Sequence, residues 1–332
     1  MLTKGQIIEL LKETDEKAIK ALFRHADQVR KKYVGDTVHL RGLIEFSNYC
    51  KRDCLYCGLR RSNNSIVRYR MTMPEIYTVA SEAKALGFQT VVLQSGEDPA
   101  YSIENLCEIV RRIKADFGFA VTLSLGERTC NDYKNLKEAG VDRYLLRFET
   151  TDSRLFSALK PDSIYTKRLK CLDWLKKLGY QVGSGNMVGL PGQSVESLAD
   201  DILKFKELDL DMVGLGPYIC NPDTPLRGSA SGTIDMVLRV TALTRIVTQN
   251  THIPATTATG AIDAEGRQKA LQCGANVLMP NLTPREYREH YMIYPDTICI
   301  DEEQHTCRFY VEAMIIGLGK TASQDAGHSL KR

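Results

Sequence analysis

Apolar residues recur at two different spacings along this chain, and the two spacings alternate. Within residues 3–33, Ile7, Leu10 and Leu11 fall at helical intervals, and a similar pattern later in the segment predicts a second helix. From residue 38 onward, short runs of apolar and β-branched residues predict strands at 38–46, 90–94, 120–125, 142–148, 180–190, 211–217, 252–257 and 275–280. The stretches between them have helical periodicity and predict helices at 73–87, 103–118, 132–140, 164–179, 194–208, 233–247 and 263–274.

Eight predicted strands that alternate with helices indicate parallel pairing through right-handed crossovers. We therefore expect an α/β fold, specifically a complete (β/α)8 TIM-type barrel with an N-terminal helical extension and a C-terminal helix. Residues 1–35 would cap the barrel, residues 36–282 would form it, and residues 283–332 would pack on it as a C-terminal extension. An open doubly wound sheet is the alternative, but no G-x-G-x-x-G follows the first predicted strand.

Composition excludes several classes of protein. The net charge of +3 is too small to indicate a nucleic-acid partner, and no stretch approaches the ~20 apolar residues of a membrane span. The N-terminus lacks the apolar core of a signal peptide, so we expect a cytoplasmic protein. In that compartment thiols stay reduced, and the ten cysteines are not expected to form a disulfide framework.

Three of the cysteines follow the first predicted strand directly, in the stretch FSNYCKRDCLYCGLRR. Cys50, Cys54 and Cys57 are spaced C-x3-C-x2-C, and no second cysteine pair or nearby histidine completes a zinc site. Thiolates are soft ligands that suit iron–sulfur clusters. Three of them leave one iron of a [4Fe–4S] cluster open, where a substrate or cofactor can bind.

This spacing, with Tyr56 before the last cysteine and a barrel around it, resembles the radical S-adenosylmethionine (SAM) superfamily. The resemblance implies that SAM binds the open iron and that one electron from the cluster cleaves it to a 5′-deoxyadenosyl radical. No catalytic side chain beyond the cluster and SAM is then expected. The GED motif at 96–98 and the Gly-rich stretch GSGNMVGLPGQ are typical of the family's cofactor site. The implied cofactor-binding residues are Tyr56, Gly96, Glu97, Asp98, Ser124, Glu149, Arg168, Met187 and Leu190.

Longer stretches, among them LQSGEDP, TLSLGE and IPATTATG, are similar to the HydE family of [FeFe]-hydrogenase maturases over roughly residues 35–300. This resemblance implies anaerobic assembly of the di-iron subcluster from a small, cysteine-bearing iron carbonyl cyanide complex. It also implies HydG and HydF as partner maturases, and ferredoxin or flavodoxin as electron donor.

Polar residues at the ends of the predicted strands are the expected substrate-binding residues, because the barrel core otherwise favours branched apolar side chains. They are Gln94, Ser95, Thr122, Arg147, Thr256 and Thr257, with Tyr291 and Tyr294 on the far side. The guanidinium of Arg147 is suited to a carboxylate.

Two alternatives stay open from the sequence: an amino-acid mutase resembling methylornithine synthase, and an iron–sulfur carrier without catalytic activity. Biotin synthase is disfavoured, because it needs a second cluster deep in the barrel and only Cys220 lies near that face.

The C-terminal region departs from some members of the HydE family, which carry a second cluster on a C-x7-C-x2-C motif. Cys299 and Cys307 supply the first two positions here, but Tyr310 occupies the third. Two thiolates make a weak cluster site, so we expect no functional second cluster.

Overall fold

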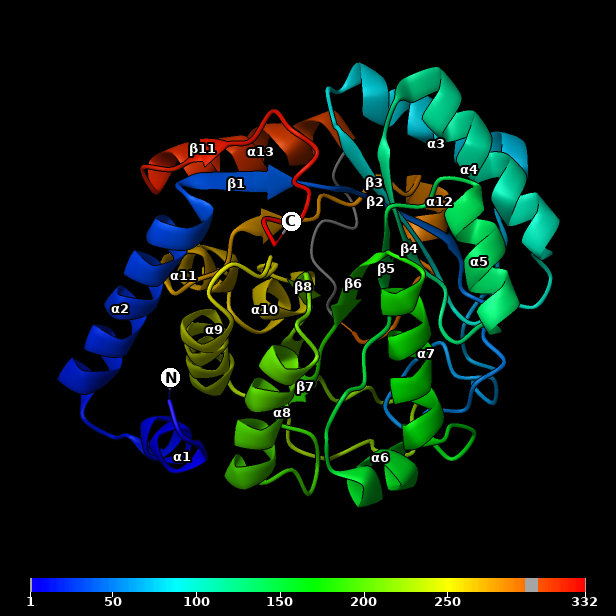
Figure 1. Cartoon of the computed structure of the whole chain (residues 1–332). Helices are drawn as coiled ribbons and strands as arrows, with labels where there is room; N and C mark the ends of the chain where they lie inside the picture. The colour runs from blue at the N-terminus through cyan, green and yellow to red at the C-terminus, as the bar shows by residue number, and fades with distance from the viewer. Residues whose placement is uncertain (1, 296–303, 332) are drawn as a thin grey trace.

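The two N-terminal helices pack against the helices that surround the parallel strands (Figure 1). The structure is a computed structural model and describes residues 2–295 and 304–331. Helix α1 (Lys4–Lys12) begins at Thr3, which forms a capping box with Gln6, and α2 (Glu16–Val34) begins at Asp15. Helix α1 contacts α8 (Val195–Glu207), and α2 lies along α9 (Ile234–Thr248).

Six parallel strands form the main sheet, and each is paired with the next along the chain. In order they are β2 (Gly42–Ser47), β3 (Thr90–Ser95), β4 (Ala120–Ser124), β5 (Arg143–Leu145), β6 (Gln181–Ser184) and β8 (Met212–Val213). Strand β1 (Thr37–Leu40) precedes β2 and pairs with β10 (Val277–Leu278) and β11 (Thr321–Ala322). Strand β7 (Met187–Val188) pairs with β9 (Gly216–Pro217). The predicted α/β fold with parallel strands is confirmed.

Isolated parallel bridges continue the pairing beyond β8. They join Met212 to His252, Pro254 to Val277, and Asn281 to Leu43 of β2. The strand predicted at 252–257 is therefore reduced to single bridges. Its last residues instead start helix α10 (Thr257–Ile262), because the Thr256 side chain caps that helix.

Helices cover the outside of the sheet close to where periodicity placed them. They are α3 (Met73–Ala85), α4 (Ile103–Phe117), α5 (Cys130–Glu138), α7 (Tyr165–Lys177), α8, α9 and α11 (Gly266–Gln272), and α13 (Gln304–Gly317) is the predicted C-terminal helix. Short elements that the sequence did not predict are α6 (Ser153–Leu159), α10, α12 (Arg285–Arg288) and β11. No helix within the described ranges is both long enough and apolar enough to cross a lipid bilayer.

Three predicted strands are each divided in two, at 38–46, at 180–190 and at 211–217. The breaks in the second and the third meet at a pair of glycines. A Cβ atom on Gly185 would lie 1.8 Å from the carbonyl oxygen of Gly214, so the two backbones can approach this closely only without a side chain.

Successive residues of the central strands face opposite sides of the sheet. Ile44, Leu93 and Val121 belong to the hydrophobic core that the sheet shares with the helices. Their neighbours Glu45 and Thr122 line an interior cavity. Thr122 therefore lies where the sequence predicted it, on the inner side of the strands, and Glu45 lies there too.

The last described residues of the chain pack against the end of the sheet at which the strands begin. After β11, Ala326 accepts hydrogen bonds from Thr90 Oγ1 (2.8 Å) and from Arg143 Nη2 (2.6 Å) through its backbone carbonyl. The ring of His328 lies 2.8 Å from Gln181 Nε2, and Ser329 hydrogen-bonds to Asp211. Segments more than 100 residues apart in sequence are thereby joined at this end of the sheet.

Candidate functional site

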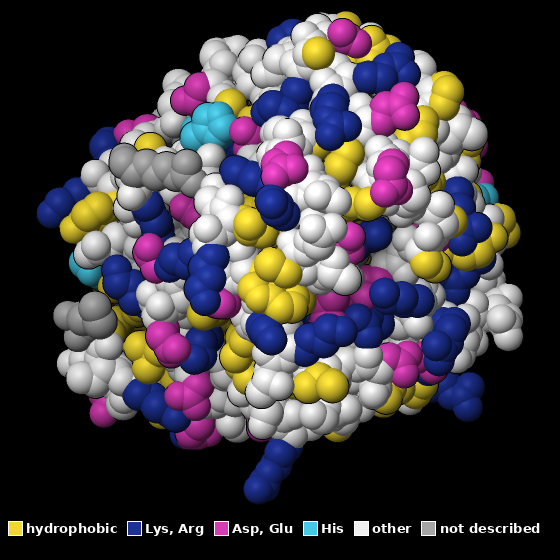
Figure 2. All heavy atoms as spheres, turned by 45° about the vertical axis from the view of Figure 1, so that its right-hand side comes forward, with side chains coloured by type: hydrophobic (Ala, Val, Ile, Leu, Met, Phe, Trp, Pro, Cys, Tyr) yellow, Lys and Arg dark blue, Asp and Glu magenta, His cyan; other side chains and the backbone are white. Residues whose placement is uncertain are grey.

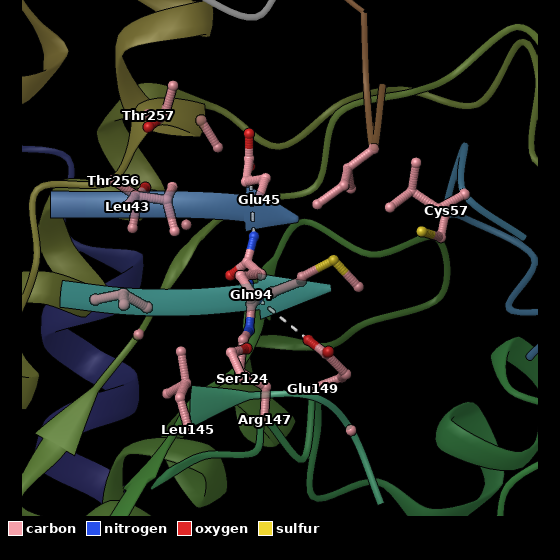
Figure 3. Close-up of a pocket in the computed structure, with 18 of the residues that line it drawn as sticks. Leu43, Glu45, Cys57, Gln94, Ser124, Leu145, Arg147, Glu149, Thr256 and Thr257 are labelled. Atoms are coloured by element: carbon pink, nitrogen blue, oxygen red, sulfur yellow. Dashed lines mark hydrogen bonds and ion pairs between the residues drawn. The ribbon is translucent and has the colours of Figure 1, made fainter. Parts of the chain in front are cut away.

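One cavity brings the cysteines and most of the predicted binding residues together. It has a volume of about 370 Å³, and the close-up in Figure 3 shows side chains from several strands converging on it. Cys50, Cys54 and Cys57 line this cavity. Arg41 and His252 also line it and belong to the strand-start side of the sheet.

Fifteen predicted cofactor or substrate residues line the same cavity: Tyr56, Gln94, Ser95, Gly96, Glu97, Thr122, Ser124, Arg147, Glu149, Arg168, Met187, Thr256, Thr257, Tyr291 and Tyr294. Two predicted cofactor residues are not among the lining residues. Asp98 accepts hydrogen bonds from Arg70 (2.7 Å) and Ser47 (2.6 Å) instead. Leu190 belongs to a small buried apolar cluster that packs against Tyr56.

The cysteine loop is held by backbone hydrogen bonds to the loop that carries the GED motif. Cys50 Sγ accepts from the backbone N–H groups of Arg52 and Glu97, both at 3.4 Å. The backbone N–H of Lys51 donates to the Glu97 carbonyl at 3.0 Å. A Cβ atom on Gly96 would lie 2.2 Å from the Tyr49 carbonyl oxygen, so glycine is required for this close approach.

The thiols fit a cluster better than a single metal ion. Among the described residues, no three His, Cys, Asp or Glu side chains converge closely enough to hold one ion. A [4Fe–4S] cluster spreads its thiolate ligands over separate irons, so its cysteines need not meet at a point. Burial raises the pKa of the Cys50 and Cys57 thiols, and bound iron would take them as thiolates.

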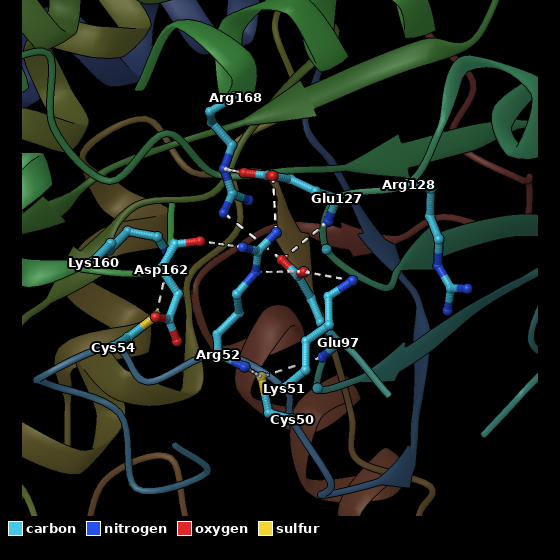
Figure 4. A network of polar contacts seen from close by, with 12 residues as sticks. Cys50, Lys51, Arg52, Cys54, Glu97, Glu127, Arg128, Lys160, Asp162 and Arg168 are labelled. Atoms are coloured by element: carbon cyan, nitrogen blue, oxygen red, sulfur yellow. Dashed lines mark hydrogen bonds and ion pairs between the residues drawn. The ribbon is translucent and has the colours of Figure 1, made fainter. Parts of the chain in front are cut away.

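A buried network of charged side chains flanks the cysteine loop (Figure 4). Arg52, inside the cysteine motif, donates to Glu97 (2.6 Å) and to Glu127 (2.9 Å). Arg168 Nε lies 3.0 Å from Glu127, and its Nη2 lies 3.9 Å from Glu97. Burial lowers the pKa of Arg168, but the two carboxylates outweigh this and raise it overall. The guanidinium therefore stays charged.

The structure pairs two predicted cofactor residues, Glu97 and Arg168, within this network. Arg52 and Glu127 complete it and were not predicted as site residues. Both stand inside motifs already singled out, CKRDC and TLSLGE, so their charge in those stretches was the available signal.

Arg147 and Glu149 form an ion pair of 3.1 Å at the wall of the cavity, and Arg147 also donates to the Asn186 carbonyl at 2.6 Å. Glu149 has φ +69°, a left-handed conformation that costs energy for a non-glycine residue. The hydroxyl of Thr122 is buried and has no hydrogen-bond partner within the described part of the chain. A buried polar atom of this kind usually binds a ligand or water, so it points to an occupant of the cavity.

Glu45 is a cavity residue that the sequence did not predict. Its carboxylate accepts a hydrogen bond from Asn281 at 2.8 Å and lies 3.5 Å from Gln94 Nε2. Burial raises the pKa of Glu45 to about 7, although the hydrogen bond from Asn281 lowers it in part. A carboxyl group that changes charge near neutral pH therefore faces the cavity.

Comparison with known proteins decides the family. The model of the Radical SAM superfamily matches residues 44–205. The chain is 50% identical over 325 residues to the [FeFe] hydrogenase maturase subunit HydE of Thermotoga maritima, covering 98% of this chain and 93% of that protein. The chain belongs to the HydE family of radical SAM enzymes.

More distant relatives agree with this assignment. A 3-methylornithine synthase of Methanosarcina barkeri is 30% identical over 285 residues, which are 85% of this chain and 80% of that protein. The crystal structure of methylornithine synthase (PylB) superimposes with a TM-score of 0.87 at 26% identity, covering 97% of this chain and 94% of that one. The lower identity makes the mutase the weaker of the two enzyme assignments.

Family membership confirms the resemblance found in the sequence. The chain is a radical SAM enzyme of the [FeFe]-hydrogenase maturase type, and its family implies a [4Fe–4S] cluster and SAM. A carrier without catalytic activity is set aside. The prediction for the C-terminal cysteines is not tested by the structure, because Cys299 and the side chain of Cys307 lie outside the described residues. Tyr310 is exposed on α13, and the absence of a second cluster stays a prediction.

Proposed function

We propose that Cys50, Cys54 and Cys57 hold a [4Fe–4S] cluster, with SAM at its open iron, and that the cavity beyond receives a small iron complex. The substrate class is a cysteine-bearing iron carbonyl cyanide unit used to build the hydrogenase di-iron subcluster. One observation carries this proposal: the three thiols and the unpartnered Thr122 hydroxyl line one cavity. When bound, the cluster supplies one electron that cleaves SAM to a 5′-deoxyadenosyl radical.

The residues around the cysteine loop would hold SAM by charge and shape. Glu97 offers a carboxylate to the amino group, and Arg168 offers a guanidinium to the carboxylate. Ser124 and Glu149 line the cavity beside them, where a ribose would lie. The apolar cluster of Met187 and Leu190, which packs against Tyr56, is suited to the adenine ring. The remaining predicted cofactor residues, Gly96 and Asp98, would fix the loop: Gly96 by close backbone approach, and Asp98 through Arg70.

The inner part of the cavity would bind the substrate. Arg147 is placed to take a carboxylate, and Thr122 has a free hydroxyl for an anionic ligand. The other lining residues in this role are Gln94, Ser95, Thr256, Thr257, Tyr291 and Tyr294. Apolar side chains such as Leu43 and Leu145 share the wall, and they would exclude water from a reactive radical.

We also propose that the parallel bridges after β8 complete the sheet as a barrel of eight units. The pairs Met212–His252, Pro254–Val277 and Asn281–Leu43 support this closure, because they lead from the last strand of the main sheet back to its first. The chain would then divide into residues 1–35, the barrel at 36–282 and the extension at 283–332.

The expected partners are HydG and HydF in an anaerobic cytoplasm, and an acidic one-electron donor such as ferredoxin or flavodoxin. Lys and Arg side chains gather on the lower half of the face in Figure 2. Three cations contact carboxylates beside the cysteine loop: Lys51 contacts Glu97, Arg61 contacts Asp162 and Lys167 contacts Glu127. Their side chains are 52%, 61% and 56% exposed. A positive surface near the cluster would attract such a donor.

The cluster assignment is tested by replacing one ligand. Anaerobically reconstituted protein should bind about four irons and form 5′-deoxyadenosine from SAM on reduction. Cys57→Ala should lose both properties, whereas Cys130→Ala, which removes an exposed cysteine on α5, should keep them. SAM cleavage at the normal rate in Cys57→Ala would contradict the assignment. About eight irons in the unaltered chain would contradict the expected absence of a second cluster.

The maturase and mutase assignments are separated by a complementation assay. Added to a reconstituted maturation mixture that contains HydG and HydF but lacks HydE, the chain should restore hydrogenase activity. Conversion of a free amino acid such as lysine, with no restored hydrogenase, would favour the mutase.

A further inference from the structure

The turn that follows α6 is fixed against the cysteine loop by contacts from three separate residues. The backbone N–H of Leu55 donates to the Leu159 carbonyl at 2.9 Å. Arg52 donates to the Asp162 carbonyl, and Arg61 lies 3.6 Å from the Asp162 carboxylate. The side chain between these anchors, Lys160, is therefore held in a defined position relative to the cysteines.

Lys160 directs its ammonium group at the cluster site. Its Nζ lies 3.4 Å from Cys54 Sγ and 3.0 Å from the hydroxyl of Tyr56. The residue is only 6% exposed, and its Nζ lies 5.5 Å from the centre of the Tyr56 ring and 5.9 Å from that of Phe156. A thiol, a phenol and two aromatic rings thus surround this positive charge.

No carboxylate within the described part of the chain pairs with Lys160, although the nearby cations Arg52 and Arg168 are both paired with Glu127. Burying an ammonium group without an anionic partner is strongly unfavourable. Of the two groups in contact with Nζ, the thiol of Cys54 takes up a negative charge more readily than the phenol of Tyr56. A thiolate that ligates iron would supply the missing partner.

We propose that Lys160 is a positioning residue that donates an N–H···S hydrogen bond to the Cys54 thiolate and raises the reduction potential of the cluster. Hydrogen bonds to the sulfurs and local net charge are known determinants of cluster potential. A nearby ammonium stabilises the reduced cluster more than the oxidised one, because the reduced cluster carries one more negative charge. The second hydrogen bond, to Tyr56, holds the ring that we place beside adenine.

The inference rests on the proposed cluster at the three cysteines, and it adds a role that the cysteine motif does not contain. Cys50 receives hydrogen bonds from backbone N–H groups, which a change of side chain other than to proline does not remove. The contact to Cys54 comes from a side chain 106 residues away, so a single substitution can delete it.

The test measures the potential of the cluster and not the activity of the enzyme. Lys160→Met, Lys160→Gln and Lys160→Arg would be reconstituted anaerobically and titrated with redox mediators, following the reduced cluster by electron paramagnetic resonance without SAM. Met and Gln should shift the midpoint to more negative values, and Arg should stay closest to the unaltered chain. Lys177→Met, which removes an exposed lysine on α7, should leave the midpoint unchanged.

An iron-loaded Met variant with an unchanged midpoint would overturn the proposal. If the Met variant does not bind iron, the Gln variant decides by the same criterion. Iron binding by Arg alone would support a need for positive charge at this place, whereas loss of iron in all three variants would reduce Lys160 to a packing role and reject the proposal. If the unaltered chain itself held no four-iron cluster, the proposed function would fail first.

Discussion

The two ends of the strands bury arginine side chains in opposite ways. Where the strands end, Arg168 faces the carboxylates of Glu127 and Glu97, and its pKa is raised overall. Where the strands begin, Arg143 donates to the backbone carbonyl of Ala326 and to the side chain of Gln181. Burial lowers the pKa of Arg143 to about 10. One end uses ion pairs between side chains, and the other uses neutral acceptors, namely a backbone carbonyl of the C-terminal segment and the Gln181 side chain of β6.

This difference indicates that the region around Arg168 serves to bind a ligand and that the region around Arg143 serves to stabilise the fold. In α/β barrels the ends of the strands carry function and their beginnings carry stability. Side chains in a network of ion pairs can exchange their partners for a charged ligand. The Thr122 hydroxyl has no partner among the described residues and can bind a ligand without such an exchange. The C-terminal segment instead supplies acceptors, such as the Ala326 carbonyl, to side chains that have no ligand to bind.

The largest effect is expected from breaking the network of ion pairs that lies where the strands end. Arg168→Met leaves Glu127 buried with one of its closest cations removed, and breaking a buried pair in this way costs about 3 kcal/mol in the free energy of unfolding. Denaturant unfolding of the iron-free protein measures this loss. Arg128→Met, on the same loop and half-exposed, should change it by less than about 0.5 kcal/mol.

A double variant sharpens this result. Adding Glu127→Gln to Arg168→Met removes the uncompensated charge and should restore part of the lost stability. Equal stability of Arg168→Met and the unaltered chain would show that the pair contributes nothing.

A second effect concerns Glu45, whose pKa is raised by burial to about 7 in the folded chain. The folded state therefore binds this proton more tightly than the unfolded state does. Its contribution to stability is present in full below the ordinary pKa of glutamate and is lost as the pH rises through 7. The loss amounts to about 3 kcal/mol, from a shift of roughly 2.5 pKa units.

Glu45→Gln removes the titrating group, so stability should vary less between pH 5 and pH 8 than in the unaltered chain. Denaturant unfolding at several pH values measures this slope. Identical pH profiles for the two proteins would contradict a raised pKa at Glu45.

The smallest effect is expected where the strands begin. Arg143→Met removes one of the two donors to the Ala326 carbonyl and one of the two donors to Gln181 Oε1, and the loss of these two hydrogen bonds should lower the free energy of unfolding by about 1–3 kcal/mol. Formation of 5′-deoxyadenosine per bound cluster should not change, because Arg143 does not line the cavity. Arg24→Met, on the exposed side of α2, is the matched control and should leave both measurements unaltered. Loss of SAM cleavage in Arg143→Met would erase the distinction between the two ends.

Much of the fold was predictable because it depends on local periodicity. The long helices, such as 103–118 and 233–247, have apolar positions at helical spacing and lie within one or two residues of their prediction. The short elements α6, α10 and α12 have too few residues to establish a period. Strand 252–257 failed for a related reason, since Thr256 is a good helix cap and the chain turns into α10 at that point.

The site was predictable only where spacing along the chain encodes the chemistry. The three cysteines lie within eight residues, and their pattern is readable without a structure. Lys160 was missed because its contact to Cys54 depends on how α6 packs against a loop 106 residues earlier. The contacts of His328 and Ser329 were unpredictable for the same reason, because their partners lie far away in sequence, Gln181 in β6 and Asp211 just before β8.

The pairing of β11 with β1 also sets the order in which the chain can fold during synthesis. Thr37 leaves the ribosome 284 residues before its partner Thr321. At typical rates of translation β1 waits on the order of tens of seconds for this neighbour. Until then one edge of β1 has no strand beside it, and such an edge is a site of aggregation. The pairing of β1 is therefore completed only after β11 has been translated.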